Sequence, residues 1–245
     1  MTKKALLIGI NYFNSDLELN GCINDVDNME TLLSAKGYRC IKLTDNKNNI
    51  KSSLYPNRKN ILKWINWFVN NTNEKTQMFL HFSGHGCYTR DRNNDERDGK
   101  DETIIPVDLI SIVDDEIIQI LSKTNGTIHS LFDCCHSGTI LDLRYRYEIN
   151  RDIPFTDKKY KETKGKIISI SGCKDKQTSA DAWFRNIKEY RGALTYFVLF
   201  ELQKEDITYK QLIKNIRFHL SKSKLTQIPQ LSSSKKININ KKIEF

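Results

Sequence analysis

The 245-residue sequence predicts an α/β fold built on a central, mostly parallel β-sheet. Five short apolar segments bounded by turn residues are typical of buried strands. Segments with helical periodicity separate them, and alternating strands and helices place successive strands side by side and parallel. The chain is long enough to bury the core of one such domain.

The expected elements follow one another along the chain. Strands are expected at 4–10, 38–44, 76–82, 127–133 and 165–171, and helices at 23–36, 58–71, 115–123, 137–145, 190–204 and 207–221. Residues 86–101 form a polar, turn-rich segment and are expected to be a loop. The segment 144–164 is basic and without a clear period, so we expect a linker between a large part (1–143) and a small part (165–245) of one domain.

Composition and hydropathy argue against a membrane-spanning or secreted protein. Mean hydropathy is −0.56 and no apolar stretch has the length of a membrane span. The first residues lead directly into the strand at 4–10, which predicts no signal peptide and no N-terminal extension. Six cysteines without framework spacing favour a reducing compartment. We therefore expect a cytoplasmic protein with no membrane contact, and we expect a monomer.

The charge is unevenly distributed. The net charge of +9 divides into −3 for residues 1–143 and +12 for residues 144–245. A basic half is compatible with nucleic-acid binding, but here the lysines are scattered among Ile and Asn without an aromatic-interleaved stripe. We interpret the charge as a basic surface and expect no nucleic-acid partner.

The main chemical signal lies where two of the expected strands end. Ser83-Gly84-His85-Gly86 follows one apolar run, and Asp133-Cys134-Cys135-His136-Ser137-Gly138 follows the next. Residues just beyond the carboxyl ends of neighbouring parallel strands meet in one crevice. A histidine and a cysteine delivered in this way are typical of a thiol nucleophile with its acid–base partner.

Cys135 is the favoured nucleophile. It is expected between the end of a strand and the start of a helix, where the helix dipole favours a thiolate. The backbone N–H groups of Cys135 and Gly86 are natural donors to an oxyanion. Cys134 competes for the role, since only one of two neighbours can face the crevice. A purely structural cysteine and histidine, or a metal–thiolate site that includes His136, are the alternatives.

These motifs together resemble the metacaspases, the caspase-like cysteine peptidases. The resemblance covers nearly the whole chain. It includes Gly21–Val26, Asp98–Asp108, Ser171–Ala182 and Gly192–Thr195, in addition to the two strand-exit motifs. It implies a caspase-like fold with helices on both faces of the sheet, and a Cys135–His85 dyad. Cys134 stands where the family usually has a small residue such as serine.

The resemblance also implies a substrate pocket and a metal site. The matching pocket positions are Cys22, Asp25, Ser83 and Asp133. Two carboxylates would attract Lys or Arg and repel the Asp side chain that caspases recognise. The alternative for Asp25 is a carboxylate that stabilises a helix N-terminus.

The calcium positions of the family match Asp101, Asp114, Asp115 and Asp142. Carboxylates gathered in loops suit a hard cation such as calcium. The alternative for Asp114 and Asp115 is an acidic first turn of the helix at 115–123.

The expected function is therefore that of a cysteine endopeptidase acting on proteins or peptides after Arg or Lys, with calcium as activator. Such an enzyme could cleave its own linker, in which the basic residues are Arg144, Arg146, Arg151, Lys158, Lys159, Lys161 and Lys164. The rival interpretation is a non-catalytic caspase-like binding module. A peptidase of the same fold with other specificity is a second rival.

Overall fold

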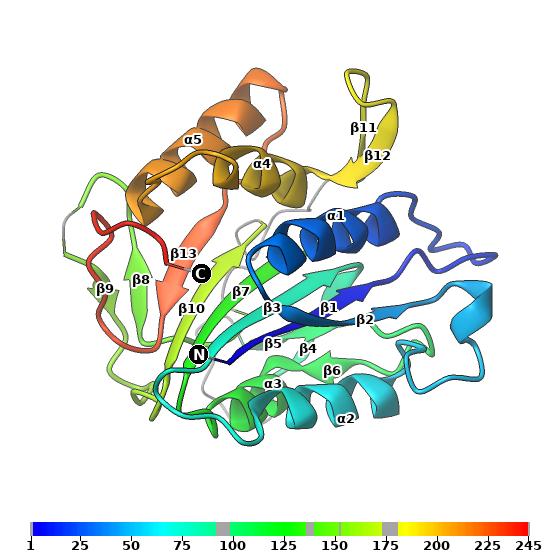
Figure 1. Cartoon of the computed structure of the whole chain (residues 1–245), viewed down its shortest axis with the longest axis horizontal. Helices are drawn as coiled ribbons and strands as arrows, with labels where there is room; N and C mark the ends of the chain where they lie inside the picture. The colour runs from blue at the N-terminus through cyan, green and yellow to red at the C-terminus, as the bar shows by residue number, and fades with distance from the viewer. Residues whose placement is uncertain (1, 92–98, 136–139, 152, 173–180, 245) are drawn as a thin grey trace.

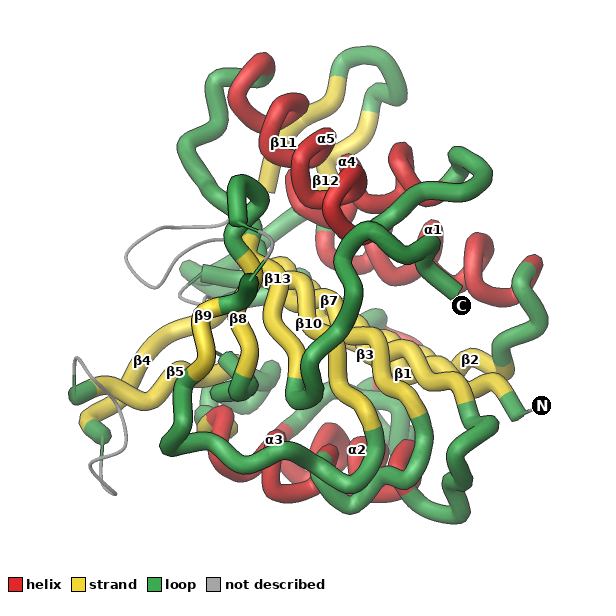
Figure 2. The backbone as a smooth tube through the Cα atoms, turned by 90° about the vertical axis from the view of Figure 1, so that its left-hand side faces the viewer, coloured by secondary structure: helices red, strands yellow, loops and turns green. Residues whose placement is uncertain are grey.

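An eight-stranded sheet lies between two layers of helices. The computed structural model describes residues 2–91, 99–135, 140–151, 153–172 and 181–244. Figure 1 shows α1, α4 and α5 on one face of the sheet and α2 and α3 on the other. Figure 2 shows the twisted strands between these layers from the side. The α/β fold with helices on both faces is confirmed.

The order of strands in the main sheet is β2-β1-β3-β7-β10-β13-β8-β9. The first five strands pair in parallel, and β13, β8 and β9 pair antiparallel. Their bounds are β1 Lys3–Gly9, β2 Arg39–Thr44, β3 Gln77–Ser83, β7 Thr127–Asp133, β10 Lys166–Ser171, β13 Gln230–Ser233, β8 Tyr145–Tyr147 and β9 Phe155–Thr156. The five parallel strands are the five expected ones. Covered by helices on both faces, their central members read as nearly continuous apolar runs.

Five α-helices cover the sheet in the described part of the chain. They are α1 Cys22–Ala35, α2 Arg58–Val69, α3 Asp114–Leu121, α4 Ala193–Leu202 and α5 Tyr209–Lys222, with a short 3-10 turn, η1, at Lys47–Asn49. One apolar cluster joins α1, α4 and α5 to one face of the sheet, and a second joins α2 and α3 to the other. A capping box between Thr208 and Gln211 begins α5.

The expected helix at 137–145 is wrong in its described part. Residues 137–139 lie outside the described residues, 140–144 are turn and irregular backbone, and β8 begins at Tyr145. Asp142 has φ of +46°, which lies in the left-handed region and cannot continue a helix. The apolar side chains that suggested a helix, Ile140, Leu141 and Leu143, are buried without helical backbone.

Several strands were also missed. The segment expected as a loop at 86–101 holds β4 Gly86–Arg90 and the start of β5 Lys100–Ile104, which form a small sheet with β6 Ile112–Val113. The segment 144–164 contributes β8 and β9 to the main sheet. The helix expected from residue 190 begins after Gly192, because β11 Asp181–Phe184 and β12 Glu189–Gly192 form a hairpin first.

Candidate active site

The expected histidine and cysteine follow strands that are direct neighbours. β3 and β7 pair in parallel with Ser83 opposite Asp133. His85 and Cys135 each lie two residues beyond this pair, at the same end of the sheet. The common register is what brings the two loops together.

Gly86 packs directly against the cysteine loop. A Cβ at this position would stand 2.1 Å from the carbonyl oxygen of Cys135 and 3.1 Å from Sγ of Cys134. Any side chain would therefore force the two loops apart. The backbone of Gly86 and that of Cys135 thus border the same small space.

The two cysteines have different surroundings. Cys134 is 1% exposed and belongs to the apolar cluster under α2 and α3, whereas Cys135 is half-buried. A buried thiol in apolar surroundings is inert as a nucleophile. Of the two neighbours, only Cys135 is accessible to a substrate.

The His85 ring is held by an identifiable hydrogen bond. Its Nε2 lies 2.8 Å from the carbonyl oxygen of Leu17. Because a carbonyl only accepts, Nε2 carries the hydrogen, and Nδ1 is the ring nitrogen left to exchange a proton. The Tyr12 hydroxyl accepts a hydrogen bond from the His85 backbone N–H at 2.9 Å and donates to the Ile105 carbonyl at 2.6 Å.

The four expected pocket residues meet beside this loop, and all are buried. The Ser83 hydroxyl donates to Asp25 Oδ2 at 2.7 Å. Burial raises the pKa of Asp25 well above its usual range, and the charge of Asp133 raises it further. Burial and the nearby Asp25 likewise raise the pKa of the Cys22 thiol. The site therefore brings two buried carboxylates together, and the charge of Arg191 offsets part of the rise in the pKa of Asp25.

Asp25 lies in the first turn of α1 without capping it. Its carboxylate points to the start of α4, where the Gly192 N–H donates to Oδ1 at 3.1 Å and Oδ2 at 2.9 Å. Thr195 holds Asp133 in a similar way, with its N–H 2.8 Å from Oδ2. The two acids of the large part are thus bound by the helix start of the small part.

Sequence reasoning missed three contributors to this site. Asp181 accepts a hydrogen bond from the Asn20 N–H at 2.7 Å and raises the pKa of Cys22 through its charge. Gly192 and Thr195 belong to a motif that carried the resemblance, but no role followed from it. Besides these three, His81 is a polar residue inside the apolar run of β3.

The expected metal ligands are brought together only in part. Asp114 is 1% exposed, its Oδ2 has no hydrogen-bond partner, and its pKa is raised well above the usual range by burial and by the charges of Asp142 and Glu102. Asp115 and Asp142 line one cavity of about 670 Å³ together with Tyr160–Lys164. Asp101 is buried on β5. In the ranges that the structure describes, no three His, Cys, Asp or Glu side chains are arranged to hold a metal ion.

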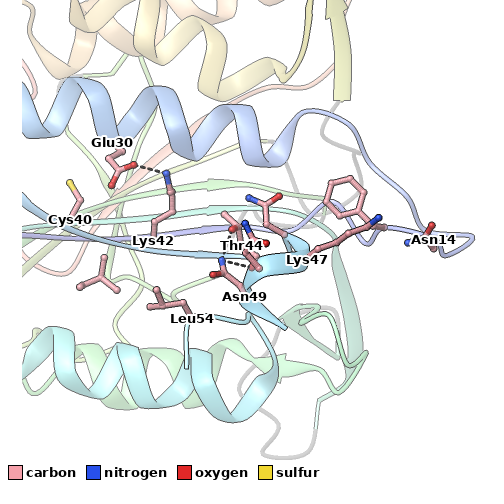
Figure 3. Close-up of a pocket in the computed structure, with 12 residues that line it drawn as sticks. Asn14, Glu30, Cys40, Lys42, Thr44, Lys47, Asn49 and Leu54 are labelled. Atoms are coloured by element: carbon pink, nitrogen blue, oxygen red, sulfur yellow. Dashed lines mark hydrogen bonds and ion pairs between the residues drawn. The ribbon is translucent and has the colours of Figure 1, made fainter. Parts of the chain in front are cut away.

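A further cavity is lined by other residues. Figure 3 shows it along the edge strand β2, between α1 and α2, with a volume of about 940 Å³. Lys42 pairs there with Glu30 at 2.5 Å, and Asn49 donates to the Thr44 hydroxyl at 2.9 Å. None of the expected site residues lines it.

Comparison with known proteins identifies the relatives of this chain. The metacaspase peptidase C14 domain profile matches residues 3–144. Metacaspase-1 of Eremothecium gossypii is 38% identical over 97% of this chain and 65% of its own length, and Metacaspase-1 of Schizosaccharomyces pombe is 35% identical over 97% of this chain and 68% of its own. The chain thus spans about two thirds of these relatives.

A solved structure supports the fold independently. A crystal structure of a Geobacter sulfurreducens protein superimposes with a TM-score of 0.72, covering 99% of this chain and 97% of the other at 24% identity. At that identity the likeness concerns the fold. In the described part of the chain, no helix has the length and apolar character needed to cross a bilayer.

Proposed function

This chain belongs to the metacaspase family of cysteine-type peptidases. On that basis we propose that it hydrolyses peptide bonds after Arg or Lys through Cys135 and His85. The observation that carries the proposal is the contact of Gly86 with the Cys135 backbone, beside a buried pair of aspartates.

The reaction follows from the roles of the two side chains. His85 Nδ1 takes the thiol proton of Cys135, and the thiolate attacks the substrate carbonyl carbon. The same nitrogen returns the proton to the leaving amine, which leaves a thioester on Cys135. Water, giving a proton to the same nitrogen, then attacks the thioester carbon; the C–S bond breaks, the acid is released, and the proton returns to the sulfur of Cys135. The N–H groups of Gly86 and Cys135 would donate to the oxyanion, each contributing about 3 kcal/mol to the transition state.

Selectivity would come from the acid pair. Asp25 and Asp133 repel one another in the free protein, as the raised pKa of Asp25 indicates. A substrate Arg or Lys would relieve that repulsion, and Arg could bind both oxygens of one carboxylate. An Asp side chain would add a third negative charge.

Calcium binding remains a proposal of its own. Buried carboxylates are the ligands that a hard cation prefers, and the unsatisfied Oδ2 of Asp114 beside Asp142 supports a cation at this place. Asp101, Asp114, Asp115 and Asp142 would hold it. When bound, calcium would neutralise the charge of this cluster.

Self-processing would fall in the segment 144–164. Arg146 lies within β8 and Arg144 donates to the Tyr160 carbonyl at 3.0 Å, so both are shielded by structure. The remaining basic residues of the segment are exposed: Arg151, Lys158, Lys159, Lys161 and Lys164. We expect cuts after these residues, mapped by mass spectrometry of the protein incubated with calcium; an intact, fully active chain would reject processing as a requirement.

We also propose a monomer in the cytoplasm. The five cysteines of the described part are free thiols, which agrees with a reducing compartment. Sedimentation of the purified chain tests the monomer, and localisation of a tagged chain tests the compartment.

The decisive experiment is cleavage of fluorogenic peptides ending in Arg, Lys or Asp, with and without millimolar-range calcium. Wild type should cleave the Arg and Lys peptides, with calcium increasing the rate, and Cys135→Ala should cleave none. A folded wild type that is silent on all three peptides would favour the binding-module alternative.

A further inference from the structure

The helix α4 supplies hydrogen-bond donors to both acids of the pocket. Gly192 is its N-cap, and Thr195 is its third residue. The first N–H groups of a helix have no partner within the helix, so carboxylates are natural acceptors for them. The N–H of Gly192 binds Asp25, and that of Thr195 binds Asp133.

Thr195 binds Asp133 a second time through its side chain. Its Oγ1 donates to Asp133 Oδ2 at 2.9 Å, the same oxygen that its N–H binds. Two donors from one residue hold this oxygen and so position the carboxylate. Thr195 is 0% exposed, so water cannot replace this contact.

His81 supports Thr195 from behind. Its Nε2 lies 3.1 Å from Oγ1 of Thr195. Because the only hydroxyl hydrogen is given to Asp133, Oγ1 must accept here, and Nε2 must carry the hydrogen. Nδ1 is buried with no hydrogen-bond partner, which suits a neutral ring. Burial lowers the pKa of His81 to about 3, so the ring stays neutral at neutral pH.

One strand therefore supports both acids. His81 and Ser83 are two residues apart on β3, so they point to the same face of the sheet. Ser83 donates to Asp25 directly, and His81 acts on Asp133 through Thr195. His85 follows in the loop two residues beyond the end of this strand.

We propose that Thr195, supported by His81, positions the Asp133 carboxylate and thereby sets the preference for arginine over lysine at the cleavage site. This inference rests on the proposed function. Arginine presents a planar fork that needs carboxylate oxygens in fixed places, whereas the lysine ammonium is a point charge with rotatable donors. A loosened Asp133 should therefore weaken binding of arginine more than that of lysine.

Two matched pairs of variants test the proposal. Thr195→Val keeps the shape and removes the hydroxyl, and Thr195→Ser keeps the hydroxyl. His81→Leu removes the donor to Oγ1, and His81→Gln can keep one. We would measure kcat and KM on peptides that differ only in Arg or Lys before the scissile bond, together with inhibition by agmatine, an arginine-like guanidine without a scissile bond. Thermal melting confirms that each variant is folded.

In Thr195→Val, we expect KM for the Arg peptide to rise on the order of tenfold or more with kcat little changed. The Arg-to-Lys preference and agmatine inhibition should fall, and Thr195→Ser should recover both. If Thr195→Val does not fold, the His81 pair gives the same comparison. A folded Thr195→Val or His81→Leu with the wild-type Arg-to-Lys ratio would overturn the inference. A wild type that neither cleaves after Arg or Lys nor binds agmatine would instead refute the underlying pocket.

Discussion

A Cβ on Gly86 would stand 2.1 Å from the carbonyl oxygen of Cys135, so the loop after β3 and the loop after β7 meet through backbone at this point. The contact requires glycine on one side. It also depends on the parallel register that places Ser83 opposite Asp133. With one strand shifted by a single residue, Cys135 and His85 would face opposite sides of the sheet.

Mutation of the two adjacent cysteines should have different effects on activity and on stability. Cys135→Ala should abolish peptidase activity, because it removes the only accessible thiol of the pair. Cys134→Ala should keep kcat/KM within a few-fold and lower the free energy of unfolding by about 1 kcal/mol, because it truncates a buried side chain. Activity assays and urea unfolding of both variants check this. Loss of activity in a folded Cys134→Ala would show that Cys135 is not the nucleophile or not the only thiol required.

Gly192 should be intolerant of a side chain. A Cβ there would stand 2.3 Å from Asp133 Oδ2 and 2.6 Å from Asp25 Oδ2, so Gly192→Ala must displace both acids. We expect kcat/KM on Arg peptides to fall by roughly 100-fold, because a displacement of substrate-binding groups by about 1 Å has an effect of this size. Gly37→Ala is the control: its φ of +81° strains alanine, but nothing lies within 4 Å. It should lose stability and keep kcat/KM, and equal losses in both variants would point to a general folding defect.

The hydrogen bonds of Tyr12 should matter to turnover. Tyr12→Phe leaves the His85 N–H and the Ile105 carbonyl without this partner, in a place where the Tyr12 side chain is 2% exposed. We expect a cost of about 1–3 kcal/mol in stability and a fall in kcat with KM little changed. Stopped-time assays at saturating substrate measure this; an unchanged kcat would show that the loop keeps its geometry without the hydroxyl.

The raised pKa of Asp25 predicts opposite pH dependences for stability and for ligand binding. Since the folded-state pKa lies above the unfolded one, the folded state binds more protons, and stability falls as pH rises between the two values. Agmatine binding requires ionised acids, so it should strengthen over the same range. Thermal melts and agmatine titrations at several pH values test the signs. Binding that does not strengthen with pH would exclude Asp25 as its acceptor.

The buried Asp114 predicts how the free protein responds to calcium. Asp114→Asn should raise the melting temperature in the chelator EDTA, because it removes repulsion with Asp142 and Glu102. The same variant should lose any stabilisation by calcium chloride, with magnesium chloride as the control salt. Equal melting of wild type in EDTA and in calcium would refute a calcium site here.

The local pattern of apolar and polar residues predicted the parallel strands and most of the helices. The runs around Leu80 and Leu131 are short, apolar and bounded by glycine or polar residues, and they became β3 and β7 within a residue of the expected bounds. The helix over 137–145 failed because Ile140, Leu141 and Leu143 are buried by tertiary contact, which a periodicity cannot distinguish from a helical face. The strand β8 and the edge strand β9 have only 3 and 2 residues, which is too short to give a recognisable sequence pattern.

For the site, sequence determined the residue types and the order of the motifs. From these followed a cysteine, a histidine and one acid at strand exits, and a second acid at the start of a helix. Which thiol is accessible was decided only in three dimensions, where the side chain of Cys134 is packed into the core and that of Cys135 is not. The hydrogen-bond partners of the two acids could not be predicted from the sequence either, since Gly192 and Thr195 are 167 and 62 residues from the carboxylates they bind. Such contacts depend on where α4 packs against the sheet, and that position is set by the summed packing of the whole domain rather than by any local pattern.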